Sequence, residues 1–399
     1  MSKHLEELLS KKRVLFLQGP MGNFFNQVAV WLESKNIETY KVNLNGGDWF
    51  FSDKTIYTAC FDYTGEFAGF STWLLDILSR CDIDALVCFG DCRKYHQMAR
   101  LVSEQLNLDF FVFEEGYIRP NFITFERYGV NAYSKFSCNL RQQSNTIIDD
   151  IEHDVQDVKN QYYKMVLSAI IYYSLIIIFY FKYKNYHHHR GMSPGSELFA
   201  WLLSGLRRVN NALFEPRKIA KLIQQHQQQY FVFPLQVHND SQIKIHSHLK
   251  DMEKYIDLVI ADFSRNASPQ HHLILKHHPM DRGYRNYQQL IKRLSIEYGC
   301  QQRIHYFCDV HLPTLLKNSL GVVTVNSTTG LQALYHDIPV KVLGSAIYDI
   351  AGLTDQKQLA KFWINPTAVD PKNYQLFRRN LIINSQLNGA FYGKTFWMR

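Results

Sequence analysis

Glycine and proline are too scarce for a collagen-like or low-complexity protein, with 20 Gly and 11 Pro among 399 residues. A strong excess of one charge is also missing, because 44 Lys and Arg against 36 Asp and Glu give a formal net charge of +8. This modest excess favours anionic partners such as phosphates, acidic sugars or an anionic membrane leaflet, and we expect no nucleic-acid partner. The hydrophobic fraction of 46% excludes disorder as the main state.

Paired cysteines are absent as well. The seven Cys stand singly and no pair has zinc-ribbon spacing, which predicts reduced thiols in a cytoplasmic protein. Residues 1–13 lack the apolar segment of a secretory signal, and we expect one short amphipathic helix there.

One apolar run, residues 165–181, bears on membrane attachment. It has 17 uncharged residues, contains several Tyr, and is flanked by Lys164, Lys182 and Lys184. A membrane-spanning helix needs about 20 apolar residues. The run therefore favours a helix that is buried in the protein or lies on a membrane surface, with a spanning helix as the alternative. We expect a cytoplasmic protein attached peripherally to the inner membrane.

Short β-branched and aromatic runs alternate with helical stretches in both halves of the chain. The expected strands are 14–18, 39–43, 85–90, 110–113, 230–234, 272–276, 304–307, 322–325 and 340–343. Strands separated by helices of 10–15 residues predict βαβ units and parallel sheets. The sequence therefore predicts an α/β protein with two Rossmann-like domains that face each other across a cleft.

The expected domain limits follow from these patterns. Residues 1–146 form an N-terminal Rossmann-like domain on the acceptor side, and residues 230–369 form a C-terminal one on the donor side. Between them, residues 147–229 are a helical connector or insertion that contains the apolar run. The last segment, 370–399, is expected to be helical and to fold back on the first domain.

Ligands of such sheets bind beyond the carboxyl ends of the strands. The first such loop contains Gln18 and Gly19 but no GxGxxG fingerprint, so it is either a close approach to a ligand or a plain turn. In the second, Asn45 and Asp48 flank two glycines. That loop suits sugar recognition and equally suits a simple turn.

Two adjacent carboxylates, Glu114 and Glu115, follow an apolar strand. One of them is expected to act as a general acid or base, with a weak preference for Glu115, while Arg119 pairs with the other. Asp240, after the first strand of the second domain, is a second candidate carboxylate. Its alternative role is a helix cap or a turn.

Nucleotide-binding groups are expected in the second domain. His278, ahead of Pro279 and between Lys276 and Arg282, is suited to donate a hydrogen bond to a phosphate. Ser327 and Thr328 join a strand to a helix and suit an anion site, with an ordinary helix cap as the alternative. No set of His, Cys and carboxylates completes a metal site, and we expect none. Together these groups suit a nucleotide sugar, whose leaving nucleotide gains negative charge.

The motifs LFLQGPMGNFF, NLNGGDWFF, FEEGYIRP, FPLQVHNDSQI, KHHPMDRGY, VVTVNSTTGLQAL and VKVLGSAIYDIAGLT resemble those of capsule polysaccharide biosynthesis and export proteins of the KpsS/LipB type. The resemblance extends over nearly the whole chain. It implies a GT-B-like, metal-independent glycosyltransferase that needs no cofactor beyond its donor substrate, CMP-Kdo. Kdo would be transferred to lysophosphatidylglycerol at the inner membrane of a Gram-negative bacterium, to start the poly-Kdo linker of a capsule.

The resemblance also implies residue roles. The paired-carboxylate motif falls on Glu114 and Glu115, the His-Pro motif on His278 and Pro279, and the Ser/Thr motif on Ser327 and Thr328. Asp240 is the match for a carboxylate that carries the sugar covalently in related transferases. Other capsule assembly proteins are implied partners. A transferase for CMP-sialic acid or another nucleotide sugar stays an alternative, as does a non-catalytic scaffold of the capsule export machinery.

Overall fold

The computed structural model describes residues 2–138, 155–159, 162–187, 194–244 and 247–398. These residues divide into two compact units. The first unit takes its residues from Met1–Cys138, Ile147–Gly191 and Arg378–Arg399, and the second from Met192–Phe377.

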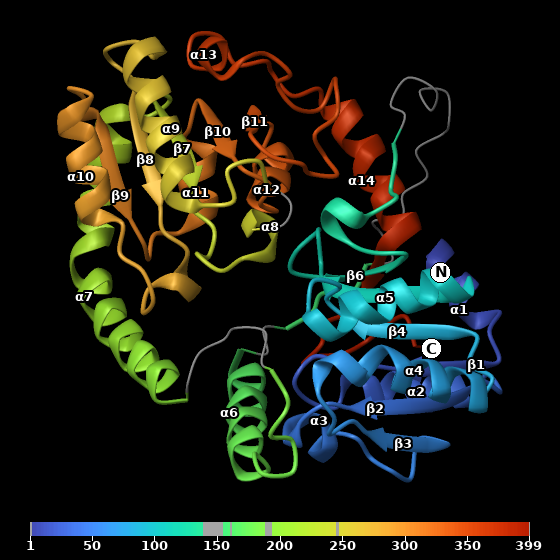
Figure 1. The fold of residues 1–399 in the computed structure, drawn as a ribbon. Coiled ribbons are helices and arrows are strands. Elements are labelled where there is room, and N and C mark those ends of the chain that lie inside the picture. The colour runs from blue at the N-terminus through green and yellow to red at the C-terminus, as the bar shows by residue number, and fades with distance from the viewer. Residues whose placement is uncertain (1, 139–154, 160–161, 188–193, 245–246, 399) are drawn as a thin grey trace. The chain divides into compact units, whose positions relative to one another are not determined.

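The first unit is built on a seven-stranded sheet with the strand order β12-β6-β5-β4-β1-β2-β3 (Figure 1). Its strands are β1 (Arg13–Phe16), β2 (Glu38–Asn43), β3 (Ala59–Asp62), β4 (Ala85–Phe89), β5 (Asp109–Glu115), β6 (Phe122–Arg127) and β12 (Gln386–Asn388). Strands β1 to β5 pair in parallel with their neighbours. Strand β6 pairs antiparallel with β5, and β12 pairs antiparallel with β6. The order 3-2-1-4-5 of the parallel strands is that of a Rossmann fold.

Helices cover both faces of this sheet because its strands are apolar on both sides. In β1, Val14 and Phe16 belong to one core cluster, while Leu15 belongs to the other. The first cluster includes side chains of α1 (Lys3–Leu9) and α2 (Phe24–Glu33), and the second includes side chains of α4 (Phe70–Arg80) and α5 (Lys94–Leu106). Three short elements, α3 (Gly46–Phe50), η1 (Phe67–Gly69) and η2 (Asn131–Tyr133), and the longer helix α6 (Tyr162–Ile178) also belong to the unit.

The second unit has a five-stranded sheet with the order β11-β10-β7-β8-β9, in which all four pairs are parallel. Its strands are β7 (Tyr230–Pro234), β8 (His272–Lys276), β9 (Ile304–Phe307), β10 (Gly321–Thr324) and β11 (Val340–Val342). Counted from β7, the order is again 3-2-1-4-5, so this unit is Rossmann-like too.

The second unit also contains seven α-helices and two short 3-10 helices among its described residues. They are α7 (Pro194–His226), α8 (Ser241–Lys244), α9 (Met252–Asn266), α10 (Gln288–Glu297), α11 (Leu312–Lys317), α12 (Thr329–Tyr335) and α13 (Leu359–Phe362), with the short η4 (Pro279–Asp281) and η5 (Gln301–Arg303). Helix α14 (Pro371–Ser385) begins in the second unit and ends in the first.

The predicted α/β class is confirmed by these two sheets. The expected strands 230–234, 272–276 and 304–307 coincide with β7, β8 and β9. Three strands were not predicted, namely β3, β6 and β12. β12 shows that the C-terminal segment returns to the first sheet, where it pairs with β6.

The expected connector, residues 147–229, is not one body. Its helix α6 belongs to the first unit and α7 belongs to the second. The apolar run forms most of α6, which lies beside α3 (Figure 1). Among the described residues, no helix is both long and apolar enough to cross a membrane.

Candidate functional site

Each sheet has one point at which the strand order reverses, and ligands of such folds bind beyond the strand ends at that point. In the first unit it lies between β1 and β4, next to Gln18 and Gly90. In the second unit it lies between β7 and β10, next to Gln236 and Asn326. Most of the residues predicted from sequence follow these strands or their neighbours.

Three of the predicted acceptor-side residues come together in the first unit, where they form a buried network. The Gln18 amide nitrogen lies 3.0 Å from Asp48 Oδ2, and Asn45 Oδ1 accepts the backbone N–H of Asp48 at 2.9 Å. The Tyr172 hydroxyl of α6 donates to Asp48 Oδ1 at 2.8 Å and accepts from the amides of Gln18 and Asn45, each at 2.9 Å. All four side chains are buried.

This network holds α6 against α3. A Cβ atom at Gly46 would lie 2.4 Å from the Leu175 carbonyl oxygen, and one at Gly47 would lie 2.5 Å from the Tyr172 ring. The two glycines therefore permit close packing of the two helices. The sequence pattern had left the role of this loop open between a simple turn and a sugar site. Burial raises the pKa of Asp48 above its ordinary value. The groups expected to bind an acceptor are thus used within the protein.

The paired carboxylates differ in environment. Glu114 is the half-buried next-to-last residue of β5, and burial is the main cause that raises its pKa to about 7. A Cβ atom at Gly90 would lie 3.5 Å from Glu114 Oε2, so the carboxyl group lies at the strand-order reversal. Glu115 is exposed, and its backbone N–H donates to Glu114 Oε1 at 2.9 Å. The environment thus favours Glu114 over Glu115 as the proton-transfer group.

Gly116 and Arg119 shape the turn after these carboxylates. A Cβ atom at Gly116 would lie 2.0 Å from the Phe122 carbonyl oxygen, so only glycine fits this close backbone approach. Arg119 is exposed, and its Nε donates to the Gly116 carbonyl at 3.2 Å. This places Arg119 on the backbone of the turn, whereas we expected it to pair with a carboxylate.

Sequence reasoning missed the loop that follows β4. Arg93 is half-buried there, and its guanidinium donates to the Gly19 carbonyl at 3.4 Å. Its positive charge lowers the pKa of both Glu114 and Asp48, although burial outweighs it in each case. Asp91 is buried and accepts the backbone N–H of Val130 at 2.8 Å. The expected strand 85–90 directly precedes this loop. Searching beyond the carboxyl end of that strand, as was done for the other strands, would therefore have found Asp91 and Arg93.

The second unit has an amide pair at its own reversal point. The Gln236 amide donates to Asn326 Oδ1 at 2.9 Å, which links the ends of β7 and β10. Next to it, the Ser327 hydroxyl oxygen accepts the backbone N–H of Thr329 at 3.2 Å. Thr328 is the N-cap residue of α12, but its side chain makes no capping hydrogen bond.

His278 is the N-cap residue of the short helix η4, which begins at Pro279. Its Nδ1 accepts the backbone N–H of Met280 at 3.2 Å. The parallel order β10-β7-β8 places one strand, β7, between the strands that lead to His278 and to Ser327. Both predicted motifs therefore lie at the same edge of the second sheet.

The two basic residues around His278 have structural contacts. Lys276 is buried, and its Nζ donates to the carbonyls of His277 and Cys308 at 3.4 and 3.3 Å. Burial lowers the pKa of Lys276. Arg282 is also buried, forms an ion pair with Asp309, and donates to the Ser204 hydroxyl at 3.2 Å. Both cations, expected to bind a nucleotide phosphate, contact protein groups here.

Asp240 directly precedes α8, and its backbone carbonyl accepts the N–H groups of Ile243 and Lys244, the last two residues of that helix. The neighbouring His238 forms a hydrogen bond with the buried Asp281 through Nδ1, so η4 and the segment before α8 are joined. Within the described part of the chain, no cluster of three His, Cys, Asp or Glu residues is arranged to hold a metal ion.

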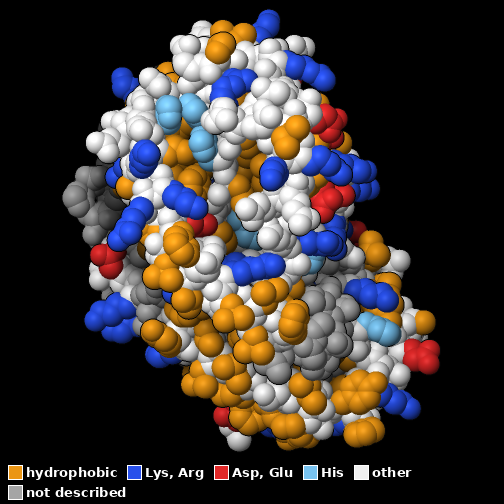
Figure 2. All heavy atoms as spheres, turned by 90° about the vertical axis from the view of Figure 1, so that its left-hand side faces the viewer, with side chains coloured by type: hydrophobic (Ala, Val, Ile, Leu, Met, Phe, Trp, Pro, Cys, Tyr) orange, Lys and Arg blue, Asp and Glu red, His pale blue; other side chains and the backbone are white. Residues whose placement is uncertain are grey.

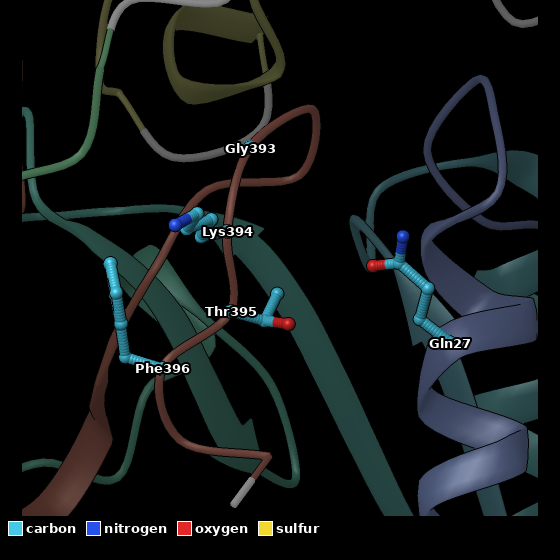
Figure 3. A pocket seen from close by; sticks show the side chains of 5 residues that line it. All are labelled: Gln27, Gly393, Lys394, Thr395 and Phe396. Atoms are coloured by element: carbon cyan, nitrogen blue, oxygen red, sulfur yellow. The ribbon is translucent and has the colours of Figure 1, made fainter.

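An open hollow of about 450 Å³ lies elsewhere in the first unit (Figure 3). Gln27 of α2 lines one side, and the C-terminal residues Gly393, Lys394, Thr395 and Phe396 line the other. None of the predicted site residues belongs to this lining.

The fold and these strand-end residues define an α/β protein of two Rossmann-like units, a class that binds phosphorylated ligands at the carboxyl ends of parallel strands. The sequence profile of the family described as "Capsule polysaccharide biosynthesis protein" matches residues 84–392. The chain belongs to this family.

Two curated relatives align over almost their full length. The capsule polysaccharide export protein KpsS of Escherichia coli is 41% identical, over 97% of this chain and 99% of its own. The capsule polysaccharide modification protein LipB of Neisseria meningitidis is 37% identical, over 100% of this chain and 96% of its own. Among solved structures, the beta Kdo 2,7 transferase of Thermosulfurimonas dismutans KpsC aligns over 95% of each chain, with 13% identity and a TM-score of 0.43.

Proposed function

We propose that the protein is a glycosyltransferase that moves Kdo from CMP-Kdo to lysophosphatidylglycerol, the first step of a poly-Kdo linker for a capsule. Family membership supports a role in capsule biosynthesis, and the motif resemblance supports the donor and the acceptor. The observation that carries the catalytic part is Glu114, a half-buried carboxyl group at a strand end with a pKa of about 7.

Glu114 suits the proton transfer that the reaction requires. An acceptor hydroxyl loses its proton as it attacks the anomeric carbon of the sugar, and a carboxylate can accept it. A general base is most effective when its pKa lies near the working pH. In a two-step route, Asp240 would carry the sugar covalently before the acceptor attacks, whereas a one-step route does not need it.

The second unit would bind the cytidylate. As the glycosidic bond breaks, the phosphate of CMP gains negative charge, and a donor such as the His278 imidazole stabilises that charge. The hydroxyls of Ser327 and Thr328, at the same sheet edge, would bind the same ligand. Lys276 and Arg282 would support the site by fixing the loops around it, since their charged groups contact the protein.

Acceptor binding is proposed for Arg93 in place of the buried network of Gln18, Asn45 and Asp48. A guanidinium group binds phosphate with two parallel hydrogen bonds, and Arg93 lies beside Gly19 at the reversal point of the first sheet. A phosphodiester headgroup matches this cation.

We further propose that α6 attaches the first unit to the inner leaflet of the cytoplasmic membrane. Its outward face exposes Tyr163, Leu167, Ile170 and Ile177, spaced at four, three and seven residues. Exposed Lys164 lies on the same helix. An apolar helix face with flanking lysines is typical of helices that lie in the plane of an anionic leaflet.

The test is CMP release from CMP-Kdo, measured with and without lysophosphatidylglycerol, for the wild type and for Glu114→Gln and His278→Ala. The proposal expects release that depends on the lysolipid and is lost in both variants. Competition by CMP-sialic acid tests the donor. A protein that shows no CMP-dependent thermal shift, yet supports capsule assembly when both side chains are replaced, would be a scaffold and not a transferase.

A further inference from the structure

Helix α7 of the second unit has two opposite faces. The inner face packs on the unit through polar and small residues. The Asn211 amide donates to Asp309 at 2.8 Å, and both carboxylate oxygens of Glu215 accept backbone N–H groups of residues 308 and 309. A Cβ atom at Gly283 would lie 2.0 Å from the Ala200 carbonyl oxygen, so the helix backbone approaches the unit closely.

The outer face of α7 is apolar and exposed. Its large side chains recur at alternating steps of three and four residues, which places them in one row opposite the packed face. This outer row consists of Phe199 (68% exposed), Leu202 (62%), Leu206 (71%), Val209 (63%) and Leu213 (65%). Figure 2 views the side on which Figure 1 shows α7, and hydrophobic side chains are exposed there. Exposed apolar areas of this kind mark interaction surfaces.

The charges on α7 indicate which partner fits the outer row. Between residues 199 and 226, the exposed charged side chains are all basic: Arg208, Arg217, Lys218 and Lys221. The single acidic residue of this range, Glu215, is turned inward by its two backbone hydrogen bonds. Arg217 and Lys221 follow Leu213 at steps of four residues and so continue the outer row, whereas Arg208 and Lys218 lie three residues from the inward-facing Asn211 and Glu215. An apolar row that continues into basic residues fits an anionic lipid surface, where each Lys or Arg adds to the attraction.

A second copy of the same helix fits less well. It would bring basic residues against basic residues, and the positions that flank the outer row, such as Leu203, Asn210 and Ala212, carry no opposite charges to pair. The row covers about two heptads before Pro216 follows, whereas stable coiled coils repeat over at least three or four heptads.

We propose that the outer row of α7 is a lipid-docking surface, by which the second unit has its own contact with an anionic membrane, separate from that of α6. The helix would lie in the plane of the leaflet, with the outer row among the acyl chains near the headgroups and Arg217 and Lys221 at the phosphates. This surface requires no donor or acceptor chemistry, so it stands even where the proposed reaction fails.

The test uses flotation of the purified full chain with two kinds of vesicle: phosphatidylethanolamine with phosphatidylglycerol, and phosphatidylcholine alone. The variant Leu206→Glu/Leu213→Glu removes two members of the outer row and keeps good helix formers in an exposed helix. The matched control, Leu258→Glu/Ile296→Glu, changes exposed side chains of α9 and α10 in the same unit. Circular dichroism and thermal unfolding verify that both variants fold.

We expect the α7 variant to bind anionic vesicles about tenfold more weakly than the wild type, and the control to bind as the wild type does. Equal binding by the α7 variant, or equal binding of the wild type to both kinds of vesicle, would overturn the proposal. Sedimentation velocity without lipid tests the second-copy alternative. A wild-type dimer that the α7 variant converts to a monomer would assign the outer row to self-association and would also overturn it.

Discussion

Replacing Glu114 with Gln keeps the size and hydrogen-bonding capacity of the side chain and removes its titratable proton. Because burial raises the pKa of Glu114 to about 7, about half of the wild-type molecules carry the carboxylate at neutral pH. A positioned general base contributes on the order of 10²–10⁴-fold to a rate. We therefore expect kcat to fall by about 100-fold or more, while the KM for CMP-Kdo changes little.

The rate and the folding stability should both depend on pH through Glu114. The wild-type rate should rise as the pH increases through about 7, since the base must be deprotonated, and the residual rate of Glu114→Gln should lack this rise. Folding stability responds as well. The pKa of Glu114 is higher in the folded state than the ordinary 4.5, so the folded protein holds an additional proton between pH 4.5 and 7.

The wild type therefore loses stability as the pH rises through that window, and Glu114→Gln does not. Discounted for the partial exposure of the side chain, the variant should gain about 1–2 kcal/mol relative to the wild type between pH 4.5 and pH 8. Urea unfolding at the two pH values measures this gain, and CMP release measures the rate. Glu115→Gln, at the exposed neighbouring position, is the matched control. Full activity in Glu114→Gln together with lost activity in Glu115→Gln would refute the assignment.

Three further predictions concern stability and acceptor binding. Tyr172→Phe should lower the free energy of unfolding by about 2–3 kcal/mol, since it removes one buried hydrogen bond to Asp48 and the hydroxyl that accepts from the amides of Gln18 and Asn45. The control Tyr163→Phe, at an 88% exposed position of the same helix, should change the free energy of unfolding by less than about 0.5 kcal/mol. If urea unfolding shows equal effects for both variants, the buried network does not stabilise the packing of α6. Asp309→Asn should destabilise the protein by about 2–4 kcal/mol in thermal unfolding, because it leaves Arg282 buried without its ion-pair partner. Arg93→Ala should raise the KM for lysophosphatidylglycerol about tenfold or more and leave the KM for CMP-Kdo unchanged in initial-rate assays, since a lost charged contact of this kind costs about 1.5–3 kcal/mol; a rise in the donor KM alone would contradict it.

The sheets were largely predictable because their strands are strongly patterned. β7, β8 and β9 are short runs of mainly apolar residues, bounded by helical stretches, and sequence alone defines their limits. The same patterning predicted two α/β blocks. Looking beyond each expected strand end then led to Glu114, His278 and Ser327 without any view of the fold.

Partners that are distant in sequence were not predictable. β12 pairs with β6 across more than 250 residues, and its three residues carry no strand pattern of their own. Gln18 and Asp48 were expected at a ligand site, because only the packing of α6 on α3 shows that they bind each other and Tyr172. In the same way, local sequence does not determine that Lys276 contacts backbone carbonyls and Arg282 contacts a carboxylate, because tertiary packing brings these partners together.

The central claim is that this chain transfers a sugar from a cytidylate donor to a lysolipid. The most direct measurement incubates the purified protein with CMP-Kdo and lysophosphatidylglycerol and follows the lipid by mass spectrometry. We expect a lipid heavier by one or more Kdo residues, formed together with CMP and absent when Glu114→Gln replaces the wild type. An unchanged lipid with intact CMP-Kdo, from a protein shown to be folded, would contradict it.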